Sequence, residues 1–311
     1  MSIRVRRRLF DPSEIRIPLV PASETRGYLV VSAYLTIENE KNIDITAKPL
    51  QFFVDTGATP TLGLFPKAAK ELKLPIGEEV TIMAGKVRRL PTVDLHVPTL
   101  PDKEIRILNV EKGYILGADS RMIEDTSGLA GIIGLPAFML GATHVDYDNN
   151  VLTLMANKPR LKRDMGNALK VPMSLWWNVM PAVSLELEDK AGQSAKIEAI
   201  LDTGAETTFL SQRATQKLAI NKRSSVLRSG TKGTKRVDLC EVSQMCVGAF
   251  VQEPATFTRK PNGESPPENG VGLNFLQHFN ILIDVRGKEL WLQPRKEAKG
   301  ITVSESSSQK R

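Results

Sequence analysis

Two copies of the tripeptide Asp-Thr-Gly are the residues of this chain best suited to chemistry. The first is Asp55-Thr56-Gly57, the second is Asp202-Thr203-Gly204, and each follows a short apolar run of the kind that forms a strand. Amide hydrolysis without a metal or a covalent nucleophile needs one group that takes a proton from water and another that gives a proton to the carbonyl oxygen. Two facing carboxyl groups that share one proton can do both, because like charges a few ångströms apart do not both ionise easily.

The residues that follow each aspartate fit this chemistry. Gly57 and Gly204 leave room for backbone N–H groups to approach the carboxylates, which a side chain would hinder. The hydroxyls of Thr56 and Thr203 can hydrogen-bond between the two loops and hold them in register. We therefore predict that Asp55 and Asp202 are the catalytic pair. The loop residues that support them are Thr56, Gly57, Ala58, Thr203, Gly204 and Ala205. In the alternative interpretation, the two tripeptides are turns between strands and serve turn chemistry alone.

The repeat extends well beyond the two tripeptides. Three further pairs of segments correspond: 28–35 with 180–187, 131–135 with 270–273, and 146–154 with 284–292. The order of the parts is the same in both halves, and the loops between them differ in length. This pattern is typical of an internal duplication of a whole domain rather than of a solenoid.

Composition and charge limit the class of protein. With 311 residues, 41% hydrophobic and 25% charged, the chain can hold two globular domains. No apolar run approaches the roughly 18 residues that cross a bilayer, and the basic N-terminus lacks the apolar stretch of a secretory signal. Only two cysteines occur, Cys240 and Cys246, which excludes a disulfide framework. Reduced thiols favour a cytoplasmic location.

Binding of nucleic acid, a metal or a cofactor is poorly supported. A net charge of +7 could attract phosphates, but aromatic residues make up only 5% and provide no stacking platform. We interpret most of the basic residues as solvated surface. His96, His144 and His278 lie far apart and show no His-Glu-x-x-His pattern, so we expect no metal site. No cofactor and no membrane partner are implied.

Short Val-, Ile- and Leu-rich segments alternate with Gly, Pro and Asn turns, which predicts an all-β-dominated chain with a few short helices. The expected organisation is an N-terminal arm at 1–26, a first lobe at 27–156, a charged linker at 157–167, a second lobe at 168–294, and a disordered polar tail at 295–311. Short helices are expected at 66–72, 136–140, 212–218 and 274–279. A loop rich in Pro and Gly is expected at 259–269.

Residues 54–59 and 201–207 resemble the active-site loops of retropepsin-like aspartic proteases. The Ala after each Gly is more like retropepsins than pepsins, which usually carry Ser or Thr there. Segments 131–135 and 270–273 resemble the glycine-containing segment beneath the active-site loop of this family. The resemblance covers most of both lobes and implies two fused retropepsin-like β-barrel lobes in a single chain, bilobal like pepsin. It implies an aspartic endopeptidase, a hydrolase that acts on polypeptides as a monomer.

In that family a β-hairpin flap closes over the substrate, and the matching regions here are 80–87 and 226–233. The substrate-binding residues that the resemblance implies are Ala84, Gly85, Gly230 and Thr231 in the flaps and Thr59 and Glu206 in the cleft. The chain also departs from the family. Neither flap carries the Tyr of the pepsin flap, and Pro136 stands where retropepsins usually have Asn or Asp, whereas the second half keeps Asn274. The cleft is therefore expected to be asymmetric.

Basic residues surround both predicted flap tips. They are Lys86, Arg88, Arg89, Arg228, Lys232, Lys235 and Arg236. We expect a polypeptide substrate with acidic residues near the cleaved bond. The alternative is that exposed hairpins are charged only for solubility. Two other interpretations also stay open: a peptide-binding or scaffold protein that keeps the fold without hydrolysis, and a homodimer that pairs its lobes between chains.

Overall fold

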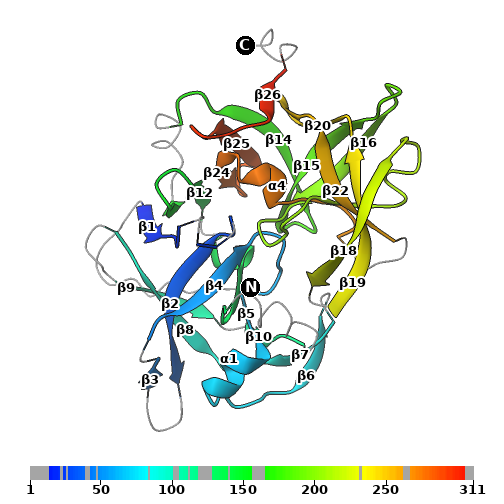
Figure 1. The fold of residues 1–311 in the computed structure, drawn as a ribbon. Coiled ribbons are helices and arrows are strands. Elements are labelled where there is room, and N and C mark those ends of the chain that lie inside the picture. The colour runs from blue at the N-terminus through cyan, green and yellow to red at the C-terminus, as the bar shows by residue number, and fades with distance from the viewer. Residues whose placement is uncertain are drawn as a thin grey trace.

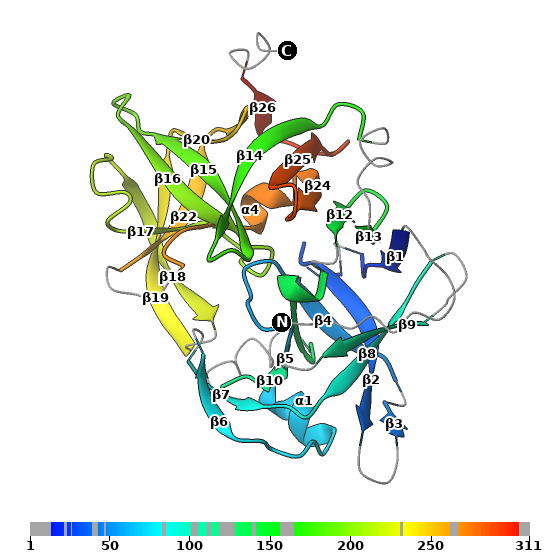
Figure 2. The same cartoon turned by 180° about the vertical axis from the view of Figure 1, so that it is seen from behind.

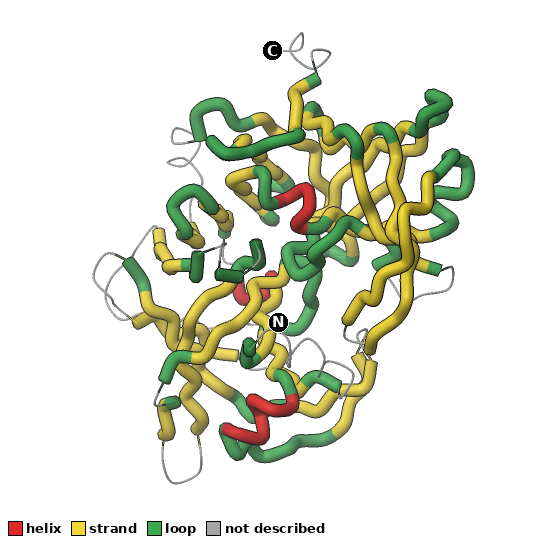
Figure 3. The backbone as a smooth tube through the Cα atoms, viewed as in Figure 1, coloured by secondary structure: helices red, strands yellow, loops and turns green. Residues whose placement is uncertain are grey.

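β-strands dominate the computed structural model of this protein, so the prediction of an all-β-dominated chain is confirmed (Figure 3). The structure describes residues 14–21, 24–25, 27–38, 43–46, 48–82, 85–100, 105–110, 113–117, 128–138, 141–155, 165–230, 233–261 and 267–304. Among these residues, no helix is long and apolar enough to cross a membrane.

The first half of the chain forms a sheet of ten strands, in the order β6-β7-β10-β5-β11-β4-β2-β8-β9 with β3 paired to β2. The bounds of these strands are β2 Val30–Glu38, β3 Ile43–Ile45, β4 Leu50–Asp55, β5 Leu62–Leu64, β6 Glu79–Ile82, β7 Gly85–Arg89, β8 Val93–Pro98, β9 Ile105–Val110, β10 Gly113–Ile115 and β11 Gly131–Gly134.

A second sheet of sixteen strands contains most of the second half (Figure 1). Its main path is β1-β13-β12-β24-β25-β14-β15-β16-β23-β17-β22-β19-β18, and β20, β21 and β26 branch from β15. The bounds are β1 Glu14–Pro18, β12 Ala142–Asp146, β13 Val151–Met155, β14 Leu169–Trp176, β15 Met180–Glu188, β16 Ser194–Leu201, β17 Phe209–Ser211, β18 Asn221–Gly230, β19 Gly233–Val242, β20 Gln244–Val247, β21 Phe250–Gln252, β22 Ala255–Lys260, β23 Gly270–Val271, β24 Phe279–Asp284, β25 Glu289–Pro294 and β26 Ile301–Val303. Within the described residues, both sheets are open and neither closes into a barrel.

The same strand pairing occurs in both halves. In the first half, β4 pairs antiparallel with β2 and parallel with β11, β11 pairs with β5, β5 runs parallel to β10, and β10 pairs with β7. In the second half, β16, β15, β23, β17, β22 and β19 repeat these pairings with the same directions. The internal repeat in the sequence thus corresponds to a repeat of topology.

The two halves are joined by two hairpins, β12–β13 at the end of the first repeat and β24–β25 at the end of the second. Strand β12 of the first hairpin pairs antiparallel with β24 of the second, and β1 and β14 cover their outer edges (Figure 2). Side chains reinforce the junction. The Asn280 Oδ1 atom accepts the Tyr147 backbone N–H at 2.9 Å, and the Arg295 guanidinium contacts an Asp148 carboxylate oxygen at 3.1 Å. This shared sheet fixes one half relative to the other.

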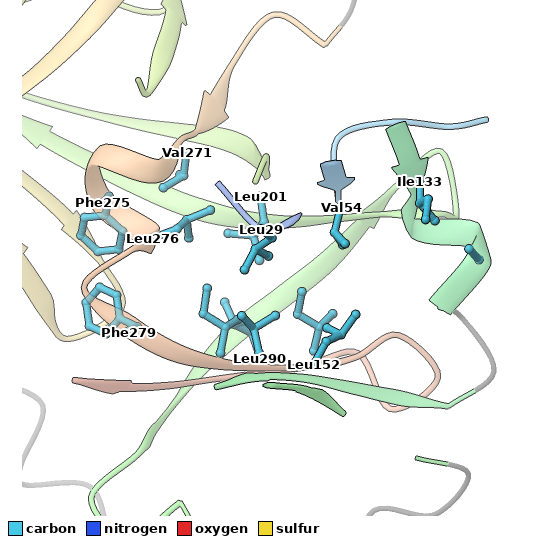
Figure 4. Packing of buried hydrophobic residues seen from close by; sticks show 14 of the residues in the cluster. Leu29, Val54, Ile133, Leu152, Leu201, Val271, Phe275, Leu276, Phe279 and Leu290 are labelled. Carbon is cyan, nitrogen blue, oxygen red and sulfur yellow. The ribbon is translucent and has the colours of Figure 1, made fainter. Parts of the chain in front are cut away.

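A continuous hydrophobic core crosses from one half to the other. Val54 and Leu201, the residues that precede the two aspartates, are both buried in it. Figure 4 shows their side chains beside Leu29, above Leu152 and Leu290 of the joining sheet. The core therefore supports both Asp-Thr-Gly loops from the same side.

The helices are short and only partly where the sequence predicts them. Helix α1 spans Pro66–Glu71 with proline in its first turn, as predicted. A 3₁₀ helix, η2, covers Leu135–Phe138, and α4 covers Leu273–Leu276 with Gly272, not Asn274, at its N-cap. The predicted helix at 212–218 is wrong, because this segment forms turns. The Ser211 hydroxyl accepts the Ala214 N–H there, and the Thr215 hydroxyl donates to the Ser211 carbonyl. The backbone bonds that follow join residues three apart, from the Gln216 N–H to the Arg213 carbonyl and from the Leu218 N–H to the Thr215 carbonyl, as in turns.

Two chain ends are more ordered than predicted. The arm at 1–26 does not precede the first strand, since β1 lies within it and pairs with β13. The tail at 295–311 is not wholly disordered, because β26 pairs with β21. In both cases the partner strand lies far away in the sequence, so local composition gives no signal. Most of the predicted linker at 157–167 lies outside the described residues.

We expect Asn280→Leu to destabilise the junction between the halves. The substitution leaves the buried Tyr147 N–H without its acceptor, which costs about 1–3 kcal/mol in the free energy of unfolding. Urea denaturation of the full chain measures this change. Asn221→Leu, at an exposed position of β18, is the matched control and should stay within about 0.5 kcal/mol of the wild type. Equal stability of the two variants would contradict the prediction.

Candidate active site

The two aspartates lie face to face at the ends of equivalent strands. Asp55 is the last residue of β4, and Asp202 directly follows β16. A Cβ atom added to Gly57 would lie 2.7 Å from the Asp202 Cγ, and one added to Gly204 would lie 2.5 Å from the Asp55 Cγ. Each loop thus presses its glycine against the carboxyl group of the other. Any side chain at either glycine would separate the pair.

Four reciprocal hydrogen bonds tie the two loops together. The Thr56 N–H donates to the Thr203 hydroxyl and the Thr203 N–H to the Thr56 hydroxyl, both at 3.1 Å. The Thr56 hydroxyl in turn donates to the Leu201 carbonyl at 2.6 Å, and the Thr203 hydroxyl to the Val54 carbonyl at 2.7 Å. Both threonines are buried. The hydrogen bonds expected between the loops are therefore present, and each hydroxyl both donates and accepts.

Two strands that contain glycine, β11 and β23, lie directly beside the two Asp-Thr-Gly loops. Strand β11 runs parallel to β4 with Gly134 opposite Asp55, and β23 runs parallel to β16. A Cβ atom on Gly134 would meet the Pro60 carbonyl oxygen at 2.1 Å, and one on Gly272 would meet the Thr207 carbonyl carbon at 2.5 Å. Only glycine allows this approach. Strands β11 and β23 are therefore in close contact with the two Asp-Thr-Gly loops.

The second loop has a brace that the first lacks. The Asn274 Oδ1 atom accepts both the Thr208 N–H, at 2.7 Å, and the Thr208 hydroxyl, at 2.9 Å. The Thr208 hydroxyl also accepts the Gly272 N–H at 3.1 Å. Pro136 occupies the equivalent position in the first half, and its side chain can make no such bonds. The two loops are therefore alike at the aspartates and different further along.

The electrostatics of the pair are unequal. Burial, the Asp202 charge and a hydrogen bond between the two side chains raise the pKa of Asp55 well above its ordinary value, against the Gly57 N–H bond at 2.8 Å. Burial also raises the pKa of Asp202, but the nearby Arg228 and Lys260 cations and the Gly204 N–H oppose this rise. The two carboxyl groups therefore lie in unequal electrostatic environments, with the two cations on the Asp202 side.

The predicted flaps are hairpins in the structure. Strands β6 and β7 pair up to Ile82 and Gly85, and β18 and β19 pair up to Gly230 and Gly233, which leaves two residues at each tip. The hairpins extend toward each other on one side of the molecule in Figures 1 and 2. Ala84 and Thr231 lie at these tips, outside the described residues. Of the two predicted cleft residues, Thr59 is half-buried and Glu206 is exposed.

Sequence reasoning singled out Arg228 but missed three residues around the second loop, Phe209, Trp176 and Lys260. Phe209 is buried with Ala205 in a small apolar cluster, and Trp176 packs against it. The Arg228 guanidinium lies 4.4 Å and the Lys260 ammonium 4.0 Å from the centre of the Phe209 ring. The sequence predicts a loop at 259–269, but Lys260 ends strand β22. An alignment of the two repeats could have pointed to Phe209, because Phe209 and Leu62 both stand seven residues after their aspartate.

Among the described residues, no group of three or more His, Cys, Asp or Glu side chains could hold a metal ion. Cys240 is buried and Cys246 half-buried, neither forms a disulfide, and burial raises the pKa of both thiols. The aspartate pair is thus the candidate site with the clearest chemistry.

Comparisons with known proteins add little to this description. A scan against protein-family models finds no match, and a search of the curated proteins finds none either. Among solved structures, the chain is similar to the crystal structure of basic 7S globulin from soybean, with a TM-score of 0.46 and 11% sequence identity. The match covers 90% of this chain and 94% of the globulin chain. A likeness of this degree says nothing about activity.

The threonine network should behave as one cooperative unit. Thr56→Val and Thr203→Val each remove a buried hydroxyl, and we expect each to lower the free energy of unfolding by about 1–3 kcal/mol. Because each hydroxyl accepts the backbone N–H of the other threonine, the two sites are coupled, and the double variant should lose less than the sum of the single losses. Urea denaturation of the four proteins measures the coupling. The Thr→Ser variants keep the hydroxyl and serve as controls, and additive losses would contradict the network.

Stability should depend on pH through Asp55. Its pKa is raised in the folded chain above the ordinary 3.8, so the folded state binds the proton more tightly than the unfolded state. The free energy of unfolding therefore falls as pH rises from about 3.8 through the folded pKa, and then levels off. Asp55→Asn removes this loss, because the amide is neutral and keeps an oxygen for the Gly57 N–H.

We expect the Asp55→Asn variant to be more stable than the wild type at pH 7, with the difference shrinking toward pH 3. Urea denaturation across this pH range provides the measurement, and Glu297→Gln, at an exposed position, is the control. Parallel stability curves for wild type and Asp55→Asn would show that the Asp55 carboxyl is not forced to hold a proton.

Proposed function

We propose that this protein is an aspartic endopeptidase that hydrolyses peptide bonds with water activated between Asp55 and Asp202. The observation that carries the proposal is the contact between the two carboxyl groups, each pressed against the glycine of the opposite loop. Two adjacent buried carboxyl groups that share a proton offer a base and an acid at one point, which is what uncatalysed amide hydrolysis lacks.

In this proposal Asp202 is the ionised partner and Asp55 the protonated one. The cations near Asp202 favour its charge, and the burial of Asp55 favours its proton. Asp202 takes a proton from the attacking water, and Asp55 gives its proton to the carbonyl oxygen of the scissile bond. When the amine leaves, the roles are reversed: Asp202 gives the proton it has taken to the amine nitrogen, and Asp55 takes a proton back from the new hydroxyl group. The threonine network keeps both groups in place, since a shift of about 1 Å can cost a hundredfold in rate.

We further propose that each half is a retropepsin-like lobe and that the β6–β7 and β18–β19 hairpins are flaps over the substrate. The repeated topology supports this. In each half the strand that ends at the aspartate pairs with a glycine-containing strand, β11 or β23, and is followed in the chain by a hairpin. A single chain with two lobes then supplies both aspartates, as in pepsin. The expected substrate is an extended polypeptide.

A catalytically silent peptide-binding protein is the second candidate. The folded chain could keep two aspartates as neutral structural groups that hydrogen-bond to each other. Both motifs are complete and their loops are symmetric at the carboxyl groups, which favours hydrolysis. The two candidates differ in one measurable property, the production of cut peptides.

Cleavage of a mixed unfolded-protein substrate from pH 3 to 8 tests the proposal. We expect the wild type to cut with a bell-shaped pH profile, because one carboxyl must be ionised and the other protonated. Asp55→Asn and Asp202→Asn should each lower the rate by at least about a hundredfold. Peptides identified by mass spectrometry give the cut sites. No cleavage by the wild type at any pH would overturn the proposal, and cleavage retained by both variants would remove the aspartates from it.

A further inference from the structure

The surroundings of the two aspartates differ in one chemical respect. Each Asp-Thr-Gly-Ala loop packs its alanine into a small apolar cluster, with Ala58 beside Phe53 and Leu116 in the first half and Ala205 beside Phe209 in the second. The clusters are equivalent in position. Among the described residues, two cations lie over an aromatic ring only in the second cluster, where Arg228 and Lys260 are within 4.4 Å of the centre of Phe209.

The register of the repeat shows that these cations are not duplicated. Lys260 lies opposite Ser211 on β17, and the residue at the equivalent place opposite Leu64 on β5 is Ile115. Arg228 lies two residues before the last paired residue of its hairpin strand, and Val80 holds that place in the first hairpin. Two aliphatic side chains in one half thus correspond to two cations in the other.

The cations come from elements that border the site and are held in place there. Arg228 is on the strand of the second hairpin and donates to the Thr258 hydroxyl at 3.2 Å. Lys260 ends β22 and donates to the Pro267 carbonyl at 3.2 Å. Both are half-buried, and both act electrostatically on Asp202. Partly buried charges are screened by solvent less than exposed ones.

The other basic residues near the hairpins are arranged differently. Lys86 pairs with Glu79 at 3.2 Å and Arg89 with Glu78 at 3.1 Å, and all four side chains are largely exposed. These pairs lie within the first hairpin and its base. Of the basic residues around the two hairpins and the end of β22, Arg228 and Lys260 are the two that act electrostatically on Asp202 in the described part of the chain.

We propose that Arg228 and Lys260 form a subsite for a carboxylate side chain of the substrate, on the Asp202 side of the cleaved bond. This inference rests on the proposed function, since it names the substrate class of the same site. The guanidinium and ammonium groups are donors only and favour anions. The equivalent positions of the first half are the aliphatic Val80 and Ile115, so the subsite on the Asp55 side is expected to take an apolar side chain. A preferred substrate therefore has an acidic residue on one side of the cut and an apolar residue on the other.

The test uses the peptide that the wild type cuts best in an unfolded-protein digest. Each position within three residues of the cut is replaced in turn by Glu, by its neutral isostere Gln, and by Lys, and kcat/KM is measured for each. On one side of the cut we expect Glu to exceed Gln by roughly tenfold at low ionic strength, as a charged hydrogen bond to a partly buried cation provides. The excess should shrink in 1 M salt.

Enzyme variants then assign the preference. Arg228→Met and Lys260→Met keep most of the aliphatic packing over Phe209 but remove one charge each, and both should bring the Glu-to-Gln ratio toward one. Lys260→Glu should invert the preference in favour of the Lys peptide. Lys217→Met, an exposed lysine of the same half, is the control and should leave the ratio unchanged. Near-UV circular dichroism checks that each variant is folded.

The ratio of kcat/KM for the Glu and Gln peptides separates a carboxylate subsite from a purely electrostatic role of the two cations. If the cations serve only to keep Asp202 ionised, Arg228→Met and Lys260→Met will shift the pH profile equally for the Glu and Gln peptides, and an unchanged ratio overturns the subsite. Equal cleavage of Glu and Gln peptides by the wild type overturns the subsite and leaves the endopeptidase proposal standing. A wild type that cuts no peptide overturns both.

Discussion

The structure depends on one constraint, the reciprocal hydrogen bonding of Thr56 and Thr203 beneath the two aspartates. Each hydroxyl accepts an N–H from the opposite loop and donates to a carbonyl of the opposite strand, so neither loop can move alone. The carbonyls belong to Val54 and Leu201, whose side chains anchor in the core shared by both halves. Two like carboxyl groups, which would repel each other when ionised, are thereby held together by the fold.

This constraint is symmetric, and the rest of the site is not. The two halves repeat the same strand pairings, and the joining sheet fixes their mutual position. Within that frame the second half adds the Asn274 brace and the cations over Phe209, while the first half has Pro136 and aliphatic residues at the matching places. Duplication followed by local substitution gives each carboxyl group its own electrostatic environment, and this difference is what would assign a proton to one aspartate of a pair.

Much of this arrangement could be predicted from the sequence because its signals lie within short segments of the chain. The Asp-Thr-Gly-Ala repeat, the glycine strands and the hairpins with their two-residue tips all depend on residues close together in the chain. What could not be predicted depends on distant partners. Strand β26 needs β21, and Lys260 belongs to a strand because β22 pairs with both β17 and β19. The predicted helix at 212–218 is a local error: the Ser211 hydroxyl caps the segment, but its backbone closes turns between residues three apart.

The central claim is that the fold forces Asp55 and Asp202 to share a proton. The most direct measurement is the pH titration of the carboxyl ¹³C shifts of the two aspartates in the selectively labelled full chain, assigned with Asp55→Asn and Asp202→Asn. The account predicts two well-separated macroscopic steps, with the Asp55 carboxyl still protonated well above 3.8. Two independent titrations near the ordinary value for aspartate would contradict it, because the carboxyl groups would then be neither buried together nor coupled.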